Sequence, residues 1–145
     1  MIPMIALVST MVVCGADDDA KMKAEVKALQ GIWIPVSAID RGKPVSKEVL
    51  EEEKSEYEFK DRTMIMRTAT ETEKSEFVID LSKTPKVISV DYGDPEQKGR
   101  KVEFIYEIKS DELKIAFRKN GNPRPESFEV KPKDQISIYV FKRKK

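Results

Sequence analysis

Apolar and polar residues alternate in short runs along most of the chain after residue 30. In the run DELKIAFR, Leu113, Ile115 and Phe117 fall on one face, while Lys114 and Arg118 fall on the other. A period of two is typical of a β-strand with one buried face. Runs that alternate in this way, or that are rich in Val, Ile, Phe and Tyr, predict strands at IWIPVSAI, SEYEFK, RTMIMRTA, EKSEFVID, KVISVDYG, KVEFIYEI, DELKIAFR, SFEV and ISIYVFKR.

One run, KVEFIYEI, does not show which of its faces is buried, because Phe104 and Tyr106 lie opposite Ile105.

The segments between these runs indicate how the strands are connected. Turn signals such as KDR, SKTP and KSD separate successive runs. Such connections are too short for parallel crossovers, so we expect an antiparallel, up-and-down sheet. About eight strands of this kind can close into a barrel without exposed edges, which predicts an all-β fold.

Two short helices are expected beside the barrel. The first covers residues 17–30, and its apolar stripe at helical spacing is formed by Met22, Val26 and Leu29. Gly31 follows, where a helix C-terminus is expected. The segment SKEVLEEEK predicts a second helix with Ser46 as its N-cap.

Residues 1–16 have the features of a secretory signal peptide. Met1 to Val13 carries no charged side chain, and this apolar run is too short to span a bilayer, which needs about 20 residues. Small residues favour cleavage after Ala16. Alternatively, Cys14 is the lipidated first residue of a bacterial lipoprotein. Both interpretations predict an exported protein, periplasmic or extracellular, that touches a membrane only through a lipid on Cys14. The remaining alternative is a cytosolic chain with a buried apolar N-terminus.

The composition excludes several classes of function. Lys and Arg number 27 and Asp and Glu number 26, so the chain lacks the basic surplus of a nucleic-acid binder. It contains no histidine and one cysteine, which excludes Ser-His-Asp and Cys-His catalytic arrangements, zinc sites of His and Cys, and an internal disulfide. We therefore expect a protein without enzymatic activity, metal or cofactor.

Several segments together resemble a family of small exported proteins abundant in planctomycete bacteria; they are LQGIW, GKP, FVIDLSKTPKVISV, IYEIKSDELKIAF, NPRPESF and ISIYVFKR. The resemblance extends from Leu29 to Lys145. It implies a lipocalin-like barrel over residues 31–145, entered by the short helix, and no established activity. The chain departs from the family at Ile32, where Thr is usual, and at Phe104, where Gly is usual. Both changes add apolar bulk that would narrow an interior cavity.

The resemblance also implies a role for Gly31 and Trp33 as the G-x-W signature that closes one end of the barrel. In lipocalin-like barrels a basic side chain from a late segment lies across the tryptophan ring in a cation–π contact. Arg124 and Arg143 are the two candidates for this partner. We expect Trp33 to be largely buried and to act structurally, not as a ligand contact.

Three other segments have both a binding and a structural interpretation. Arg124, held between two prolines in NPRPESF, could bind an anion at a barrel mouth, or it could cap Trp33 or pair with a carboxylate. The turn from Asp80 to Lys86 could attract an anion through its lysines. Glu51 to Glu53 could bind a cation, although their spacing matches no metal loop. The structural interpretation is preferred in each case.

The expected function is non-catalytic binding of a small hydrophobic molecule or of a cell-envelope partner by a monomer. An eight-stranded barrel can be filled by its own side chains or can hold one small ligand. The alternative is therefore a structural or surface-interaction protein with a filled barrel. If a ligand enters, the expected lining residues are Phe59, Met66, Phe104, Tyr106, Ile115 and Phe117.

Overall fold

The computed structural model describes residues 16–91, 101–118, 123–131, 133 and 135–145. The elements in this part of the chain are α1 (Ala16–Leu29), β1 (Gly31–Asp40), β2 (Lys43–Pro44), α2 (Lys47–Glu53), β3 (Glu56–Lys60), β4 (Thr63–Arg67), β5 (Thr72–Asp80), β6 (Lys86–Asp91), β7 (Lys101–Lys109), β8 (Glu112–Arg118) and β9 (Ile136–Arg143). The predicted first helix is confirmed to within one residue. The predicted leader, with Cys14, lies outside the described residues, apart from its last residue, Ala16.

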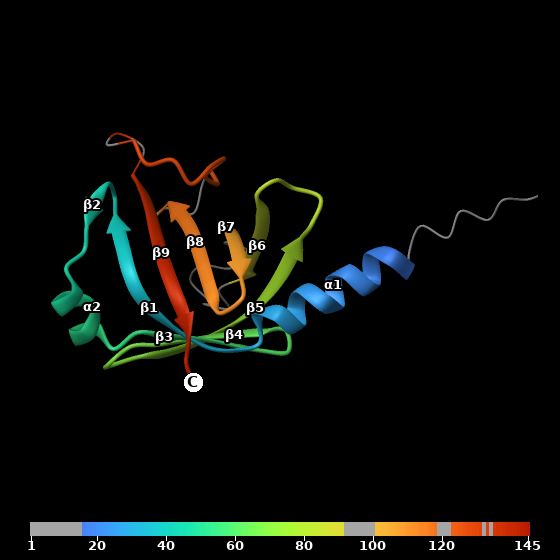
Figure 1. Ribbon diagram of the computed structural model, residues 1–145, viewed down its shortest axis with the longest axis horizontal. Helices are drawn as coiled ribbons and strands as arrows, with labels where there is room; N and C mark the ends of the chain where they lie inside the picture. Colours follow the sequence, from blue (N-terminus) through green and yellow to red (C-terminus); the bar gives the residue numbers. More distant parts are fainter. Residues whose placement is uncertain (1–15, 92–100, 119–122, 132, 134) are drawn as a thin grey trace, which may run out of the picture.

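Eight strands, β1 and β3 to β9, close into an antiparallel barrel, and the short β2 pairs with the end of β1 (Figure 1). From β3 to β9 each strand pairs with the next along the chain, and β9 returns to pair with β1 over Trp33 to Ile39. The predicted antiparallel, up-and-down barrel is confirmed. Tight turns make it possible, and several contain residues with positive φ, such as Asp61 and Ser110.

Helix α2 lies beside β1 and begins as the sequence predicts (Figure 1). The side chain of Ser46 accepts a hydrogen bond from the backbone nitrogen of Val49 at 3.3 Å. Leu50 is the buried residue of this helix. No helix within the described residues is long and apolar enough to cross a membrane.

The barrel interior holds the main hydrophobic cluster. The predicted alternation is confirmed in β8, where Leu113 and Ile115 are buried in this cluster and Phe117 packs against it. The apolar stripe of α1 packs against the same cluster, with Leu29 fully buried. The other buried members are Trp33, Phe59, Met64, Phe77, Ile79, Ile88, Val90, Val102, Phe104, Tyr106 and Phe141.

The predicted strand SFEV, residues 127–130, is wrong. This segment has no strand pairing, and Phe128 and Val130 instead pack on the outer face of the barrel. There they cover a second buried cluster, formed by Val87, Ile105, Ala116, Ile136 and Ile138. Strands β6 to β9 are apolar on both faces, so their outer face needs a cover. This arrangement also explains why KVEFIYEI did not show one buried face.

The two ends of the barrel differ. The Trp33 end contains the start of β1, the end of β9 and the C-terminal turn of α1, at the lower edge of Figure 1. The Asp40 end contains the end of β1, the start of β9 and the end of β8. Because neighbouring strands are antiparallel, their starts and ends alternate between the two ends of the barrel.

Candidate functional site

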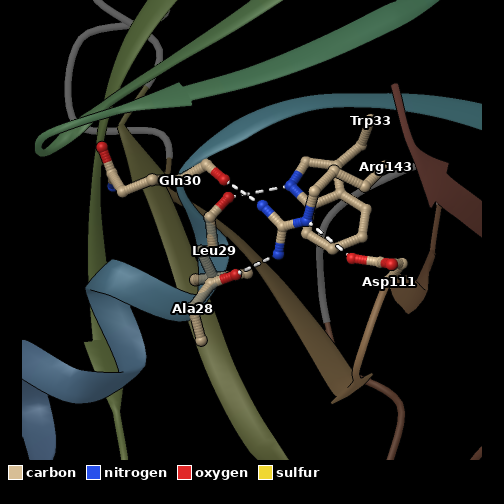
Figure 2. Close-up of polar contacts among 6 residues, drawn as sticks. All are labelled: Ala28, Leu29, Gln30, Trp33, Asp111 and Arg143. Atoms are coloured by element: carbon tan, nitrogen blue, oxygen red, sulfur yellow. Dashed lines mark hydrogen bonds and ion pairs between the residues drawn. The ribbon is translucent and has the colours of Figure 1, made fainter. Parts of the chain in front are cut away.

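Trp33 closes its end of the barrel. Its side chain is fully buried, and its ring nitrogen Nε1 donates a hydrogen bond to the carbonyl oxygen of Leu29 at 2.8 Å. The guanidinium carbon of Arg143 lies 4.3 Å from the centre of the Trp33 ring (Figure 2). Of the two candidate partners, Arg143 therefore makes the cation–π contact and Arg124 does not.

Arg143 also ties the last strand to the end of α1. Figure 2 shows its guanidinium donating to the carbonyl oxygens of Ala28, at 2.8 Å, and Gln30, while Asp111 accepts from Nε at 3.2 Å. With Leu29 bonded to Trp33, three successive carbonyls at the helix C-terminus have donors, and a cation is favoured at that end of a helix. Gly31 turns the chain here with φ of +115°, and a Cβ on it would lie 3.1 Å from Arg143 Nη1. Gly31, Trp33 and Arg143, together with the C-terminal end of α1, therefore form a structural closure.

Arg124 has a different partner. Its Nη1 forms an ion pair with Glu103 at 2.8 Å, on the outer face of β7. It also lines a surface groove of about 270 Å³ together with Arg118 and Glu126. Of the predicted structural interpretations, pairing with a carboxylate is confirmed and capping of Trp33 is wrong.

A contact that the sequence did not predict fixes α1 to the barrel wall. Glu25 accepts hydrogen bonds from Lys86 Nζ and from the Tyr106 hydroxyl, each at 2.8 Å. Burial and the neighbouring Glu25 carboxylate raise the pKa of Tyr106 well above its usual range. Tyr106 is therefore a neutral donor at physiological pH, and Lys86 supplies the balancing charge.

The six expected ligand-lining residues all point into the barrel or pack against its interior cluster. Phe59, Ile115 and Tyr106 are almost fully buried, and the Tyr106 hydroxyl is held at the Trp33 end by Glu25. Phe104 faces the interior as expected. Ile32 lies on the outer face, beside Glu58, so its bulk does not narrow the interior.

Aromatic rings form a continuous row through the interior, which we call the interior aromatic row. Phe104 meets Phe117 edge-to-face at 5.4 Å, Phe117 stacks on Tyr139 at 5.7 Å, and Tyr139 stacks on Phe141 at 6.1 Å between ring centres. Tyr57 ends the row, 4.7 Å from Phe141. Such ring pairs stabilise a fold by more than the burial of their apolar area alone would.

Some inward-facing side chains of the barrel are partly exposed. Phe141 and Leu113, near the Trp33 end, are fully buried. Phe117, Tyr139 and Met66 also face inward, yet they remain only half-buried. Solvent therefore reaches part of Phe117, Tyr139 and Met66, whereas Trp33, Leu113 and Phe141 are fully buried.

Polar groups accompany the aromatic rings at the Asp40 end. Asp40 accepts a hydrogen bond from the hydroxyl of Ser137 at 2.8 Å, and Ser137 lies opposite Phe117 on the same face. Burial, Asp40 and Glu53 raise the pKa of Tyr139, in that order of effect. Asp40 also has two cations beside it, Lys43 directly opposite on β2 and Arg41 at 3.7 Å.

Ser75 is a further polar residue on the interior face, on strand β5. It is 8% exposed, and its hydroxyl has no hydrogen-bond partner among the residues that the structure describes. A buried hydroxyl without a partner costs about 1–3 kcal/mol. This group can accept or donate a hydrogen bond to a molecule in the barrel.

A second surface feature lies outside the barrel, between β1 and α2. A groove of about 510 Å³ there is lined by Ile34, Pro35, Val36, Lys47, Leu50, Glu51, Lys54 and Ser55. Two of these lining residues, Ile34 and Val36, are large apolar side chains that are exposed. This groove is a candidate surface for a protein partner.

The remaining predicted segments have structural geometry. At the end of β5, Asp80 accepts hydrogen bonds from the Ser82 hydroxyl at 2.6 Å and from the Ser82 backbone nitrogen at 2.9 Å, and these bonds lower the pKa of Asp80. Glu51 to Glu53 are exposed on α2. The described residues contain no group of three or more potential metal ligands.

Comparison with protein-family models, with curated proteins and with solved structures gives no match for this chain.

Proposed function

We propose that the barrel binds a small, largely apolar molecule on the interior aromatic row, which the ligand reaches from the Asp40 end. The observation that carries the proposal is the half-buried state of Phe117 and Tyr139, large apolar side chains that face inward. Small-molecule sites are typically apolar and aromatic, with a few polar groups that fix orientation. Ser75 and Asp40 are such groups here.

The proposed role is non-catalytic and belongs to an exported, lipocalin-like protein. The Trp33–Arg143 contact supports the lipocalin-like assignment, because it has the geometry that the G-x-W resemblance implies. Export rests on the apolar residues 1–13, and either cleavage after Ala16 or lipidation of Cys14 would follow. Mass spectrometry of the protein purified from an exporting host distinguishes these two N-termini by mass.

The second candidate is a structural protein that acts through its surface. The exposed apolar side chains of Ile34 and Val36 in the β1–α2 groove favour it. In this case side chains fill the barrel, and the protein binds a partner in the groove instead of a ligand in the interior. The two candidates place binding on different residues, so a binding titration with variants of each site distinguishes them.

Phe117→Ala is expected to weaken binding of the neutral fluorescent probe N-phenylnaphthylamine about 5- to 10-fold, because the probe loses one aromatic wall worth about 1 kcal/mol. The measurement is a fluorescence titration at constant protein concentration. Val36→Ala, in the β1–α2 groove, is the matched control and should leave the affinity unchanged. Circular dichroism of both variants checks that the barrel is folded.

Two results would contradict the interior site. The first is the absence of saturable binding by the unchanged protein, which would mean that side chains fill the barrel. The second is a loss of affinity in Val36→Ala with none in Phe117→Ala, which would place the probe in the surface groove.

A further inference from the structure

A groove outside the barrel lies between α1 and the turn that joins β3 to β4, and we call it the α1 groove. Its volume is about 350 Å³, near the low end of the range for small-molecule pockets. The residues that line it are Met22, Lys23, Val26, Lys27, Gln30, Asp61 and Arg62. A space of this size and shape suits one slender molecule.

Hydrogen bonds from one side chain hold the two walls of the α1 groove together. Gln30 Nε2 donates to the carbonyl oxygen of Asp61 at 3.1 Å, and Gln30 Oε1 accepts from the Asp61 backbone nitrogen at 2.6 Å. Gln30 Nε2 also donates to the carbonyl oxygen of Val26 at 3.0 Å. The helix and the turn are therefore fixed before any ligand arrives, which lowers the entropic cost of binding.

The floor of the α1 groove is apolar. Met22 and Val26 lie one turn apart on α1, so they are neighbours on the helix surface. Both are partly buried, and both pack against the main hydrophobic cluster as well as lining the groove. The apolar surface of the core thus continues into the groove, where an alkyl chain can bury part of its area.

The rim of the α1 groove is positively charged. Lys23 and Lys27 lie one turn apart on α1, Arg62 comes from the turn, and Asp61 is the acid that lines the same groove. Within the part of the chain that the structure describes, none of the three cations forms an ion pair. Like charges at this helical spacing repel one another, and an anion placed between them removes that repulsion.

Cations in two other surface grooves already have partners. Arg124 pairs with Glu103, and Lys86 pairs with Glu25, each at 2.8 Å. An anionic ligand in either of those grooves would have to compete with a carboxylate of the protein. In the α1 groove it would meet three cations that are free to bind it.

We propose that the α1 groove binds a single-chain amphiphile with an anionic head, such as a free fatty acid. The head lies beside Lys23, Lys27 and Arg62, and the alkyl chain lies on Met22 and Val26. The small volume favours one free chain over a two-chain membrane lipid. This site is separate from the barrel interior, so its test does not depend on the interior ligand.

The test is a fluorescence titration with dansylaminoundecanoate, a fluorescent fatty acid, followed by displacement with unlabelled compounds below their micelle-forming concentrations. Decanoate is expected to displace this probe at a concentration about tenfold lower than decanol, which has the same chain without the charge. Butyrate has the same head on a shorter chain, so it should be at least about tenfold weaker than decanoate.

The double variant Lys23→Gln, Lys27→Gln should weaken decanoate about fivefold and leave decanol unchanged, because only the charged head loses its partners. Lys21→Gln, Lys74→Gln is the matched control, since it removes the same charge from exposed lysines outside the α1 groove. The control should bind decanoate as the unchanged protein does. N-phenylnaphthylamine, whose proposed site is inside the barrel, should bind both double variants equally.

Four results would overturn the α1 groove as an anion site. They are no saturable binding of dansylaminoundecanoate, equal displacement by decanoate and decanol, equal losses in the two double variants, and protein that sediments with phosphatidylglycerol vesicles while decanoate fails to compete. The last result would assign the cations to a membrane surface. If N-phenylnaphthylamine binds while decanoate does not, the α1 groove alone fails. If decanoate binds as expected while N-phenylnaphthylamine does not, the interior site alone fails.

Discussion

Replacing Trp33 by alanine is expected to lower the free energy of unfolding by about 3–5 kcal/mol, the usual cost of removing a large buried ring. The side chain is fully buried and donates a hydrogen bond to Leu29. Its loss would leave a cavity, an unbonded carbonyl at the end of α1, and Arg143 without its aromatic partner. Urea denaturation followed by circular dichroism measures the change.

Two further variants make this expectation falsifiable. Trp33→Phe keeps much of the ring and loses the indole donor, so it should cost about 1–3 kcal/mol and should fold even if the alanine variant does not. Val78→Ala is the control on an exposed site, 62% exposed on β5, and should change stability by less than about 0.5 kcal/mol. A Trp33→Ala cost below about 1 kcal/mol would mean that the ring does not close the barrel.

Replacing Arg143 by methionine is expected to cost about 2–3 kcal/mol, the second largest effect. Methionine has a similar length but cannot donate to the carbonyls of Ala28 and Gln30, and it has no charge for the ring of Trp33. Trp33 is the only tryptophan in the chain, so its fluorescence reports directly on this contact during urea unfolding. We also expect α1 to detach at lower urea concentration.

The control for Arg143 is another arginine whose partner is a single carboxylate. Arg67 pairs with Glu58 at 2.9 Å, with 36% and 20% of the two side chains exposed, and Arg67→Met should cost less than about 1 kcal/mol. Arg143→Lys should recover less than half of the lost stability, because an ammonium cannot form the same fork. Equal costs for Arg143→Met and Arg67→Met would contradict the structural role of Arg143.

Alternation alone was sufficient to predict most of the barrel. It identified β8 with its buried face, and short turns between runs predicted antiparallel neighbours. It was wrong for SFEV because a short apolar segment can pair in a sheet or cover one, and local sequence does not distinguish these outcomes. SFEV covers the sheet because the outer cluster around Ile105 needs a cover, and that cluster forms only when β6 to β9 are adjacent.

The closing contact could be narrowed but not settled from the sequence. Both arginines lie in the last part of the chain, Arg124 before β9 and Arg143 within it, and from the sequence each could reach Trp33. The register of β1 with β9 places Arg143 directly opposite Trp33, whereas Glu103 holds Arg124 on the outer face. The choice depends on long-range pairing, which local patterns do not encode.

The acidic part of the candidate site could not be predicted, because a β-bulge changes the alternation of β1. The register shifts between Pro35 and Ser37. Strict alternation from Trp33 would turn Ile39 inward and Asp40 outward. The extra residue reverses this phase, so Asp40 faces inward beside Ser137.

The proposed ligand binds inside the barrel at the Asp40 end. Proton–carbon NMR spectra of the aromatic rings, recorded with and without saturating N-phenylnaphthylamine, locate the bound probe. We expect shifted ring signals for Phe104, Phe117 and Tyr139, and an unchanged signal for Phe128, which packs on the outer face. A shift of Phe128 with none for the three interior rings would contradict it.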